Sequence, residues 1–166
     1  MKTIVAVDNN WGIGKKNDLL FHLKKDMQYF REKTLNKVVV MGSNTLFSFP
    51  GSKPLPKRIN IVLYPGGKPI DGCIVVQSLE ELSAKLKEYN SDDIFIVGGA
   101  MFYRTMLDYC DTAYITKVEA DGEAEVFFEN LDLRAGWELV DEGAADADEG
   151  YNIKFSVYKN KLVKTF

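Results

Sequence analysis

Cysteine and histidine are scarce in this 166-residue chain, which has two cysteines, Cys73 and Cys110, and one histidine, His22. The two cysteines form no CxxC pair, and they are too few and too far apart for a disulfide framework. Because a structural zinc site needs about four N, S or O ligands, we expect no metal site. Both thiols are expected to be small buried side chains in a reducing cytosol, with a Cys–His nucleophilic pair as the alternative. We expect His22 in a loop or on the surface.

Long apolar stretches are also missing. No segment approaches the roughly 18 apolar residues of a membrane-spanning helix, and the apolar run before Asp8 is too short for a secretory signal. The sequence therefore predicts a soluble, cytoplasmic protein without a membrane partner. An excess of basic residues is absent as well, since 21 Lys and Arg against 24 Asp and Glu give a net charge of −3. A nucleic-acid-binding domain is usually basic, so we expect no nucleic-acid partner.

The charges are unevenly spread along the chain. Residues 119–149 hold twelve acids and one base, a local net of −11, which leaves +8 on the rest because the total is −3. We interpret the acidic run mainly as a solvated face. The remaining segments are net basic, and a basic balance can attract small anionic ligands.

The composition is otherwise that of a globular protein, with 46% apolar and 27% charged residues. At roughly 150 residues per domain, the length predicts one domain over residues 1–166. Short β-branched runs at 4–7, 38–41, 59–63, 74–76 and 94–97 suit strands covered on both faces. Helical spacing separates several of them, over 23–34, 79–86 and 100–107, with Ser78 and Glu81 as a capping-box pair. This alternation predicts an α/β fold with a mainly parallel sheet.

The last third of the chain has a different pattern. Strand candidates at 112–118, 137–140 and 155–158 follow one another with few helical segments between them. Antiparallel strands are therefore expected to close the sheet.

Two passages run from an apolar strand through glycine into a helix. One is Val97-Gly98-Gly99-Ala100, and the other spans 39–45, where Gly42 ends the strand and Asn44 or Thr45 can cap the helix. Glycine lets the backbone approach a phosphate, and a helix N-terminus presents free N–H groups, although such turns also occur for structural reasons alone. Because parallel strands end at one edge of a sheet, both turns can meet there around a cofactor with two phosphates.

Asp26 lies in the first turn of the helix expected over 23–34, on the same face as Phe30 and Thr34. A carboxylate at this position can simply compensate the helix dipole. The alternative is an ionised acceptor that pairs with adjacent N–H donors of a flat heterocycle between apolar walls. The polar, glycine-containing loop 9–18 precedes this helix and is a candidate lid.

These residues, at these spacings, carry a resemblance. Gly12-Ile13-Gly14, Leu19, Asp26, Phe30 and Thr34 are similar to the signature of the dihydrofolate reductase family. Further similar segments follow in order: VVVMGSNT (38–45), PLPKRIN (54–60), IVGGAMFY (96–103) and YITKV (114–118). The resemblance covers essentially the whole chain. It implies a dihydrofolate reductase-like α/β fold with about eight strands, about four helices and an antiparallel C-terminal strand.

The resemblance implies NADPH-dependent reduction of 7,8-dihydrofolate to 5,6,7,8-tetrahydrofolate, which supplies one-carbon metabolism. Hydride passes from the nicotinamide C4 to C6 of the pterin, and N5 is protonated by water rather than directly by Asp26. In this reading Asp26 holds the pterin 2-amino group and N3, Thr116 supports that carboxylate, and Phe21 takes the aromatic position beside them. These three are the implied catalytic residues of an enzyme that we expect to be a monomer and a target of antifolates.

The resemblance also implies the ligand contacts. The expected substrate-binding residues are Ile4, Ala6, Asp26, Met27, Phe30, Phe49, Leu55, Arg58, Val97, Tyr103 and Thr116, with Arg58 clamping the glutamate tail. The expected cofactor-binding residues are Ala6, Ile13, Gly14, Asn17, Asp18, Leu19, Gly42, Ser43, Asn44, Thr45, Leu63, Tyr64, Ser78, Val97, Gly98, Gly99, Ala100, Met101, Phe102 and Tyr103.

Some positions depart from the family pattern. Leu20-Phe21 replaces the usual Pro-Trp, so an indole N–H is missing there. Positions that often carry arginine, lysine or serine near the cofactor's 2′-phosphate hold other residues, namely Ser43, Tyr64, Gln77 and Met101. NADPH is the expected cofactor, but its preference over NADH is open. The alternatives are a related pteridine or pyrimidine reductase of the same fold and a nucleotide-binding module without turnover. Arg58 favours folate, because a ribityl-phosphate substrate has no glutamate tail to clamp.

Overall fold

The central sheet is built around β1 (Lys2–Val7), the strand with which the chain begins. In the computed structural model, which describes residues 1–166, the strands lie in the order β10-β12-β8-β1-β7-β4-β5-β6, and β11 pairs with β12 beside this path. The strands from β8 to β6 in this order are parallel, whereas β12 is antiparallel to both β8 and β10. The predicted α/β fold, with a mainly parallel sheet and an antiparallel C-terminal strand, is confirmed.

The parallel strands of this sheet are short and mostly apolar, whereas the strands near the C-terminus carry more polar residues. The strands other than β1 are β4 (Val38–Gly42), β5 (Ile59–Leu63), β6 (Cys73–Val76), β7 (Ile94–Ile96), β8 (Thr112–Val118), β10 (Trp137–Glu142), β11 (Asp146–Asp148) and β12 (Tyr151–Asn160). A second, three-stranded sheet joins β2 (Gly12–Lys15) to β3 (Asp18–Leu19) and to β9 (Val126–Phe127).

Four α-helices connect the parallel strands, as predicted. They are α1 (Lys24–Thr34), α2 (Ser43–Ser48), α3 (Leu79–Leu86) and α4 (Ala100–Met106), with single 3₁₀ turns at Pro50–Ser52, Ser91–Asp93 and Leu107–Tyr109. The hydroxyl of Ser78 accepts a hydrogen bond from the N–H of Glu81 at 3.1 Å, which confirms the predicted cap of α3. The carboxylate of Glu81 reaches back to the N–H of Gln77 at 2.7 Å, one residue further than in a standard capping box.

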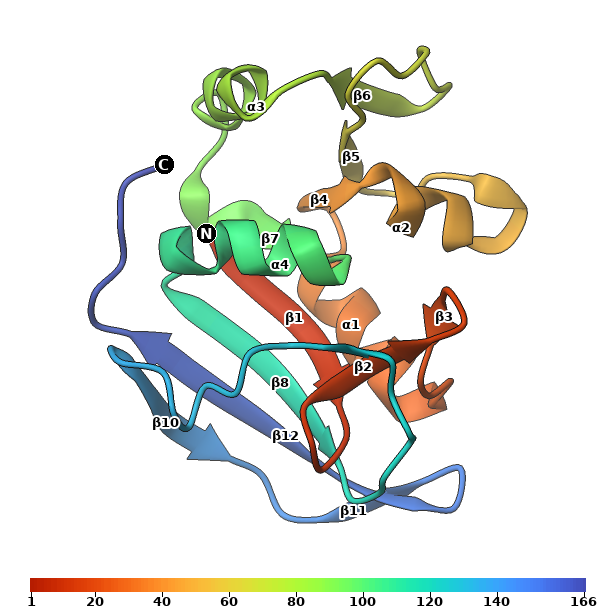
Figure 1. Cartoon of the computed structure of the whole chain (residues 1–166), viewed down its shortest axis with the longest axis vertical. Coiled ribbons are helices and arrows are strands. Elements are labelled where there is room, and N and C mark those ends of the chain that lie inside the picture. Colours follow the sequence, from red (N-terminus) through yellow and green to blue (C-terminus); the bar gives the residue numbers. More distant parts are fainter.

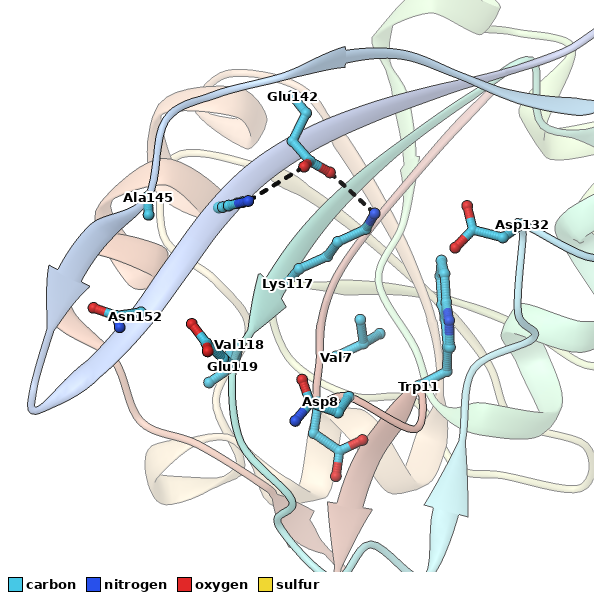
Figure 2. A pocket seen from close by; sticks show the side chains of 12 residues that line it. Val7, Asp8, Trp11, Lys117, Val118, Glu119, Asp132, Glu142, Ala145 and Asn152 are labelled. Carbon is cyan, nitrogen blue, oxygen red and sulfur yellow. Dashed lines mark hydrogen bonds and ion pairs between the residues drawn. The ribbon is translucent and has the colours of Figure 1, made fainter.

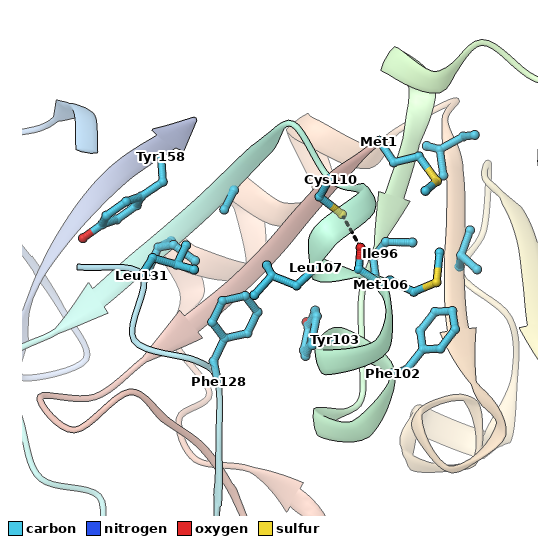
Figure 3. Packing of buried hydrophobic residues seen from close by; sticks show 14 of the residues in the cluster. Met1, Ile96, Phe102, Tyr103, Met106, Leu107, Cys110, Phe128, Leu131 and Tyr158 are labelled. Carbon is cyan, nitrogen blue, oxygen red and sulfur yellow. Dashed lines mark hydrogen bonds between the residues drawn. The ribbon is translucent and has the colours of Figure 1, made fainter. Parts of the chain in front are cut away.

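The sheet has an apolar core on each face. In Figure 1, α4 lies in front of β1 and α1 lies behind it. The larger cluster, 23 buried residues, contains residues of α3, α4 and β8, and Figure 3 shows Phe102, Tyr103, Met106 and Phe128 within it. A second cluster, of six buried residues, has side chains of α1 and α2 packed with β1, β4, β5 and β7. Burial on both faces explains why the strands read as continuous apolar runs.

Residues 9–18 are more regular than the predicted loop. They include β2 and the first residue of β3, Asp18, and β9 pairs with β2 on the side opposite β3. Asp8, only 3% exposed, holds the base of this hairpin: its carboxylate accepts hydrogen bonds from the N–H groups of Asn10 (2.9 Å), Gly12 (2.7 Å) and Gly122 (2.9 Å). A Cβ on Gly12 would lie 2.3 Å from that of Ala124, so only glycine permits this approach.

The two cysteines differ in how deeply they are buried. Cys110 is fully buried and burial raises the pKa of its thiol to about 12, whereas Cys73 is only half-buried, contrary to the expectation for both. His22 is exposed and lies beside Asp18, at 3.5 Å, as expected for a surface residue. No group of three or more His, Cys, Asp or Glu side chains is arranged to hold a metal ion, and no helix is long and apolar enough to cross a membrane.

The packing of α3 on the sheet gives a stability prediction. Leu82 is fully buried in the larger cluster, whereas Leu79 on the same helix is 41% exposed. Leu82→Ala is expected to lower the free energy of unfolding by about 2–5 kcal/mol, because it removes buried contacts and leaves a cavity. Leu79→Ala is the matched control, with an expected change within about 0.5 kcal/mol. Urea unfolding of the two variants measures this; similar losses would contradict the packing described.

Candidate active site

One apolar wall gathers predicted substrate-binding residues from distant parts of the chain. The six-residue cluster on the α1 face includes Ile4 of β1, and Phe30, Phe49, Leu55 and Val97 pack against it. The wall therefore combines a strand, a helix and the segment before β5. Such a surface suits the face of a flat ring system, and it still needs polar groups at its edge to orient a ligand.

Asp26 is a buried ionisable group on α1, one turn before Phe30 of this wall. Burial raises the pKa of its carboxyl above the ordinary value of 3.8; the neighbouring Thr116 hydroxyl lowers it, and the negative charge of Asp148 raises it further. Asp26 makes no ion pair with any cation of the chain. Thr116 Oγ1 is buried and has no hydrogen-bond partner within the protein. The hydroxyl faces the Asp26 carboxyl, near enough to lower its pKa but without a well-formed hydrogen bond, so it can also serve a ligand or a bound water.

The sheet register places Ala6 and Thr116 side by side. They are direct partners in the parallel pairing of β1 with β8, and Phe155 of β12 is the next partner along. Ile4 pairs with Tyr114 two residues earlier, so it points to the same face as Ala6. Ala6 therefore lies beside Thr116, the residue whose hydroxyl acts on Asp26.

Tyr103 joins the two faces of the sheet. Its ring is 7% exposed and packs edge-on against Phe128, with ring centroids 5.1 Å apart. Its hydroxyl donates a hydrogen bond to the carbonyl of Ile4 at 2.9 Å. Burial raises the pKa of Tyr103, and the charge of Asp26 raises it further, so the hydroxyl stays protonated within electrostatic reach of that carboxyl. The Ile4 carbonyl, expected to face the pterin, already accepts this bond and keeps one lone pair for a ligand.

Arg58 is a cation without an acid partner. Its Nε donates to the carbonyl of Pro56 at 2.9 Å, and one terminal N–H donates to the Thr34 hydroxyl at 3.3 Å, at the end of α1. Partial burial lowers the pKa of its guanidinium, and the charge of Arg31 lowers it further. A guanidinium held beside another cation favours an external carboxylate, which it can bind through two parallel hydrogen bonds.

The two predicted glycine turns do meet. β4 and β7 are neighbours, and the N–H of Gly42 bonds to the carbonyl of Gly98 at 2.9 Å. Gly98 has φ +130°, and a Cβ on it or on Gly99 would lie 3.3 Å from Thr45 Oγ1. Side chains here would fill the space between the starts of α2 and α4. The first turns of these helices contain Ser43, Asn44, Thr45, Ala100 and Met101, and Met101 is 79% exposed.

The predicted adenosine end is built from uncharged groups. Leu63 ends β5, and the ring of Tyr64 packs edge-on against Phe47 with centroids 5.5 Å apart. Gln77 is not free to bind a phosphate, because its amide accepts from the N–H of Gly66 at 2.7 Å and donates to the carbonyl of Gly67 at 3.2 Å. The Ser78 hydroxyl is engaged in the cap of α3.

Some of the remaining predicted residues are buried, and others are exposed at the surface. Ile13 and Gly14 are buried on β2, whereas Asn17, Asp18 and Leu19 are exposed at the tip of the hairpin. Met27 is 58% exposed, at the rim of the site. Phe102 lies in the larger core cluster, so only its backbone can face a cofactor. Phe21 packs edge-on against Tyr151, with centroids 5.1 Å apart, and its catalytic role stays a prediction.

Two hollows lie near this region. One, of about 440 Å³, is lined by Ala100 and Tyr103 of the predicted set together with Phe127 and Phe128. The other, of about 290 Å³, contains none of the predicted residues. Glu142 pairs with Lys117 at 3.1 Å, and Figure 2 shows this pair in one part of the hollow and Asp8 in another. Both of its lysines, Lys117 and Lys154, pair with Glu142, and none of the predicted site residues lines it, so we place the active site elsewhere.

Sequence reasoning missed Asp148. It belongs to the acidic run interpreted as a solvated face, yet it is 4% exposed. Its Oδ2 accepts hydrogen bonds from the N–H groups of Lys25 (2.9 Å) and Asp26 (3.2 Å). The only local signal is that Leu23, at the N-cap of α1, has no side chain able to cap. That deficit indicates a remote acceptor without identifying it.

The chain is therefore an α/β protein with two regions suited to ligands. One can hold a flat heterocycle beside the buried Asp26 carboxylate, and the other can hold the phosphates of a cofactor at the two glycine turns. Residues 1–160 match the family model described as dihydrofolate reductase. The chain is 34% identical to a dihydrofolate reductase of Bacillus subtilis over 161 residues, covering 95% of this chain and 93% of the relative. It is 32% identical to one of Haemophilus influenzae over 160 residues, covering 95% and 97%.

A solved structure is similar throughout. Dihydrofolate reductase from Enterococcus faecalis, complexed with NADP(H) and RAB-propyl, superposes with a TM-score of 0.84 at 30% identity. The alignment covers 96% of this chain and 95% of that one. The chain belongs to the dihydrofolate reductase family.

The raised pKa of Asp26 gives a prediction about stability. An acid whose pKa is higher in the folded than in the unfolded state adds stability at low pH and loses it as pH rises through the folded pKa. Asp26→Asn should therefore unfold at a higher temperature than the wild type at pH 7, with the difference shrinking toward zero below pH 3.8. Thermal unfolding at both pH values tests this. A gain that is the same at both would show that desolvation of the charge is not its source.

The unpaired guanidinium gives a second prediction. Arg58→Leu should raise the KM for dihydrofolate by about 10–100-fold, the range for a lost charge-assisted hydrogen bond, with little change in the KM for NADPH. The exposed Lys53→Leu on the same segment is the control for general loss of positive charge. Steady-state kinetics with each ligand varied in turn measures both constants. Equal effects on the two KM values would disprove the clamp.

Proposed function

We propose that the protein reduces 7,8-dihydrofolate to 5,6,7,8-tetrahydrofolate with NADPH. The observation that carries this function is the buried Asp26, which has no cation partner, faces the Thr116 hydroxyl and lies one helical turn before Phe30 of the apolar wall. A carboxylate can accept two N–H groups of a pterin at once in a charge-assisted arrangement. The wall supplies the apolar surface that the pterin ring needs.

The residues present also suit the cofactor. NADPH, when bound, supplies the hydride for reduction of the pterin. The approach of Gly42 to Gly98, with the space that a Cβ at Gly98 or Gly99 would fill, gives a backbone cradle for the pyrophosphate. Ile13 and Gly14 of the hairpin, with Ala6 on β1, would face the nicotinamide and keep water from the reacting carbon.

Asp26 has a second task in the reaction, which requires a proton at the pterin N5. Its negative charge near the ring favours a protonated N5, while a water molecule delivers the proton. The Tyr103 hydroxyl keeps its own proton and orients the Ile4 carbonyl at the ring edge. Thr116 would hold the carboxylate or a bound water in place, and Phe21 would close the site beside it.

The glutamate tail of the substrate would lie along α1. Phe30, Phe49 and Leu55 would flank the aminobenzoyl group, and Arg58 would bind the α-carboxylate at the end of the helix. The family resemblance favours a monomer that works in the cytoplasm, has small molecules as its partners and is inhibited by antifolates. Light scattering of the protein tests the oligomeric state.

An absorbance assay tests the reaction. The purified protein, mixed with NADPH and dihydrofolate, should consume both, with loss of absorbance at the nicotinamide band. Asp26→Asn should keep the fold but slow hydride transfer at neutral pH by about 10²-fold or more, and should change its pH dependence. No consumption at micromolar wild-type enzyme would refute the function. An unchanged pH profile in the variant would remove Asp26 from the mechanism.

A further inference from the structure

The hairpin between β11 and β12 delivers a single buried acid. Asp148 ends β11 and pairs with Tyr151, and only Glu149 and Gly150 connect them. Both connecting residues have positive φ, +48° and +87°, the pattern of a two-residue turn whose twist matches antiparallel strands. The tight turn fixes the register of the hairpin. Asp148 is 4% exposed, whereas its neighbours Ala147 and Glu149 are exposed.

The acid completes the start of α1. The first N–H groups of a helix lack intrahelical partners and normally bind the side chain of the N-cap residue. Leu23 stands at that position and cannot bind them. Asp148 Oδ2 accepts from both Lys25 and Asp26, at 2.9 and 3.2 Å. The backbone of Asp26 is therefore tied directly to the β11–β12 hairpin.

No cation lies between the carboxylates of Asp148 and Asp26, because the nearby lysines pair with other acids. The ammonium of Lys25 is held by Asp146 at 2.9 Å, and that of Lys24 lies 4.0 Å from Glu149, both in exposed positions. Thr116 faces Asp26 from β8, Tyr103 is within electrostatic range from α4, and Tyr29 is one turn along α1. None of these groups is a cation that could offset a second carboxylate.

We propose that Asp148 is a positioning residue for the reaction: it fixes the first turn of α1 and holds a negative charge beside Asp26. This inference rests on the proposed function, because it assigns Asp148 a task in placing and tuning the carboxylate that binds the pterin. The ion pairs Lys24–Glu149 and Lys25–Asp146 also connect the hairpin to α1, but they are exposed and water screens their charges. The buried carboxylate is screened much less, so its charge acts on Asp26.

Asp148→Asn separates charge from hydrogen bonding, because the amide oxygen can still accept from both N–H groups. The Asp26 carboxyl should then titrate at lower pH than in the wild type, followed by NMR of protein labelled with ¹³C at the aspartate carboxyl groups. The pH profile of hydride transfer should move in the same direction. Asp148→Ala also removes the acceptor and should in addition raise the KM for dihydrofolate about fivefold, the factor that matches a lost cap.

Asp146→Asn is the matched control. It removes the same charge from the same strand and the same partner helix, but at an exposed position, so the titration of Asp26 should stay as in the wild type. An unchanged Asp26 titration in Asp148→Asn, or an equal change in both variants, would overturn the proposal. Asp148→Ser carries the same test if the Asn variant does not fold. The NMR readout needs no turnover, so an inactive wild-type protein would refute the function without deciding this point.

Discussion

Burial of the Asp26 carboxyl between α1 and the sheet is unfavourable for its charged form, because water that would solvate the charge is excluded. The chain supplies no cation to compensate. It supplies instead a neutral hydroxyl on β8, a tyrosine hydroxyl that retains its proton, and a second carboxylate that caps the same helix turn. The Asp26 carboxylate therefore remains available to accept N–H donors of a ligand. The apolar packing on both faces of the sheet offsets the unfavourable free energy of burying its charge.

Much of this arrangement could be predicted from the sequence because its signals are local. Continuous β-branched runs indicated strands covered on both faces, and Ser78 with Glu81 marked the start of α3. The passages through Gly42 and through Gly98 placed two turns at one sheet edge, and the structure joins them by a hydrogen bond. The family resemblance then selected Asp26 and Arg58 from many charged residues, which helix geometry alone could not do.

The contacts that escaped prediction are those between segments far apart in the chain. Asp148 lies in an acidic stretch whose composition is that of a solvated face, and only the β11–β12 register turns it inward. The hairpin at 12–19 looked like a loop because its partner strand, β9, lies more than a hundred residues later. Gln77, which the sequence marked only as a departure from the family pattern, is likewise engaged by the turn at Gly66. A single sequence contains no signal for such pairings.

The cap of α1 by Asp148 links an early element of the chain to a late one, across 122 residues from Asp26. During synthesis from the N-terminus, α1 emerges long before the hairpin that supplies its acceptor. Until β11 has been made and has paired with β12, two N–H groups at the start of α1 have only water as a partner. The orientation of the Asp26 carboxylate, which we propose binds the pterin, is therefore settled only after the β11–β12 hairpin has been made and has folded, which couples competence for ligand to a segment far downstream in the chain.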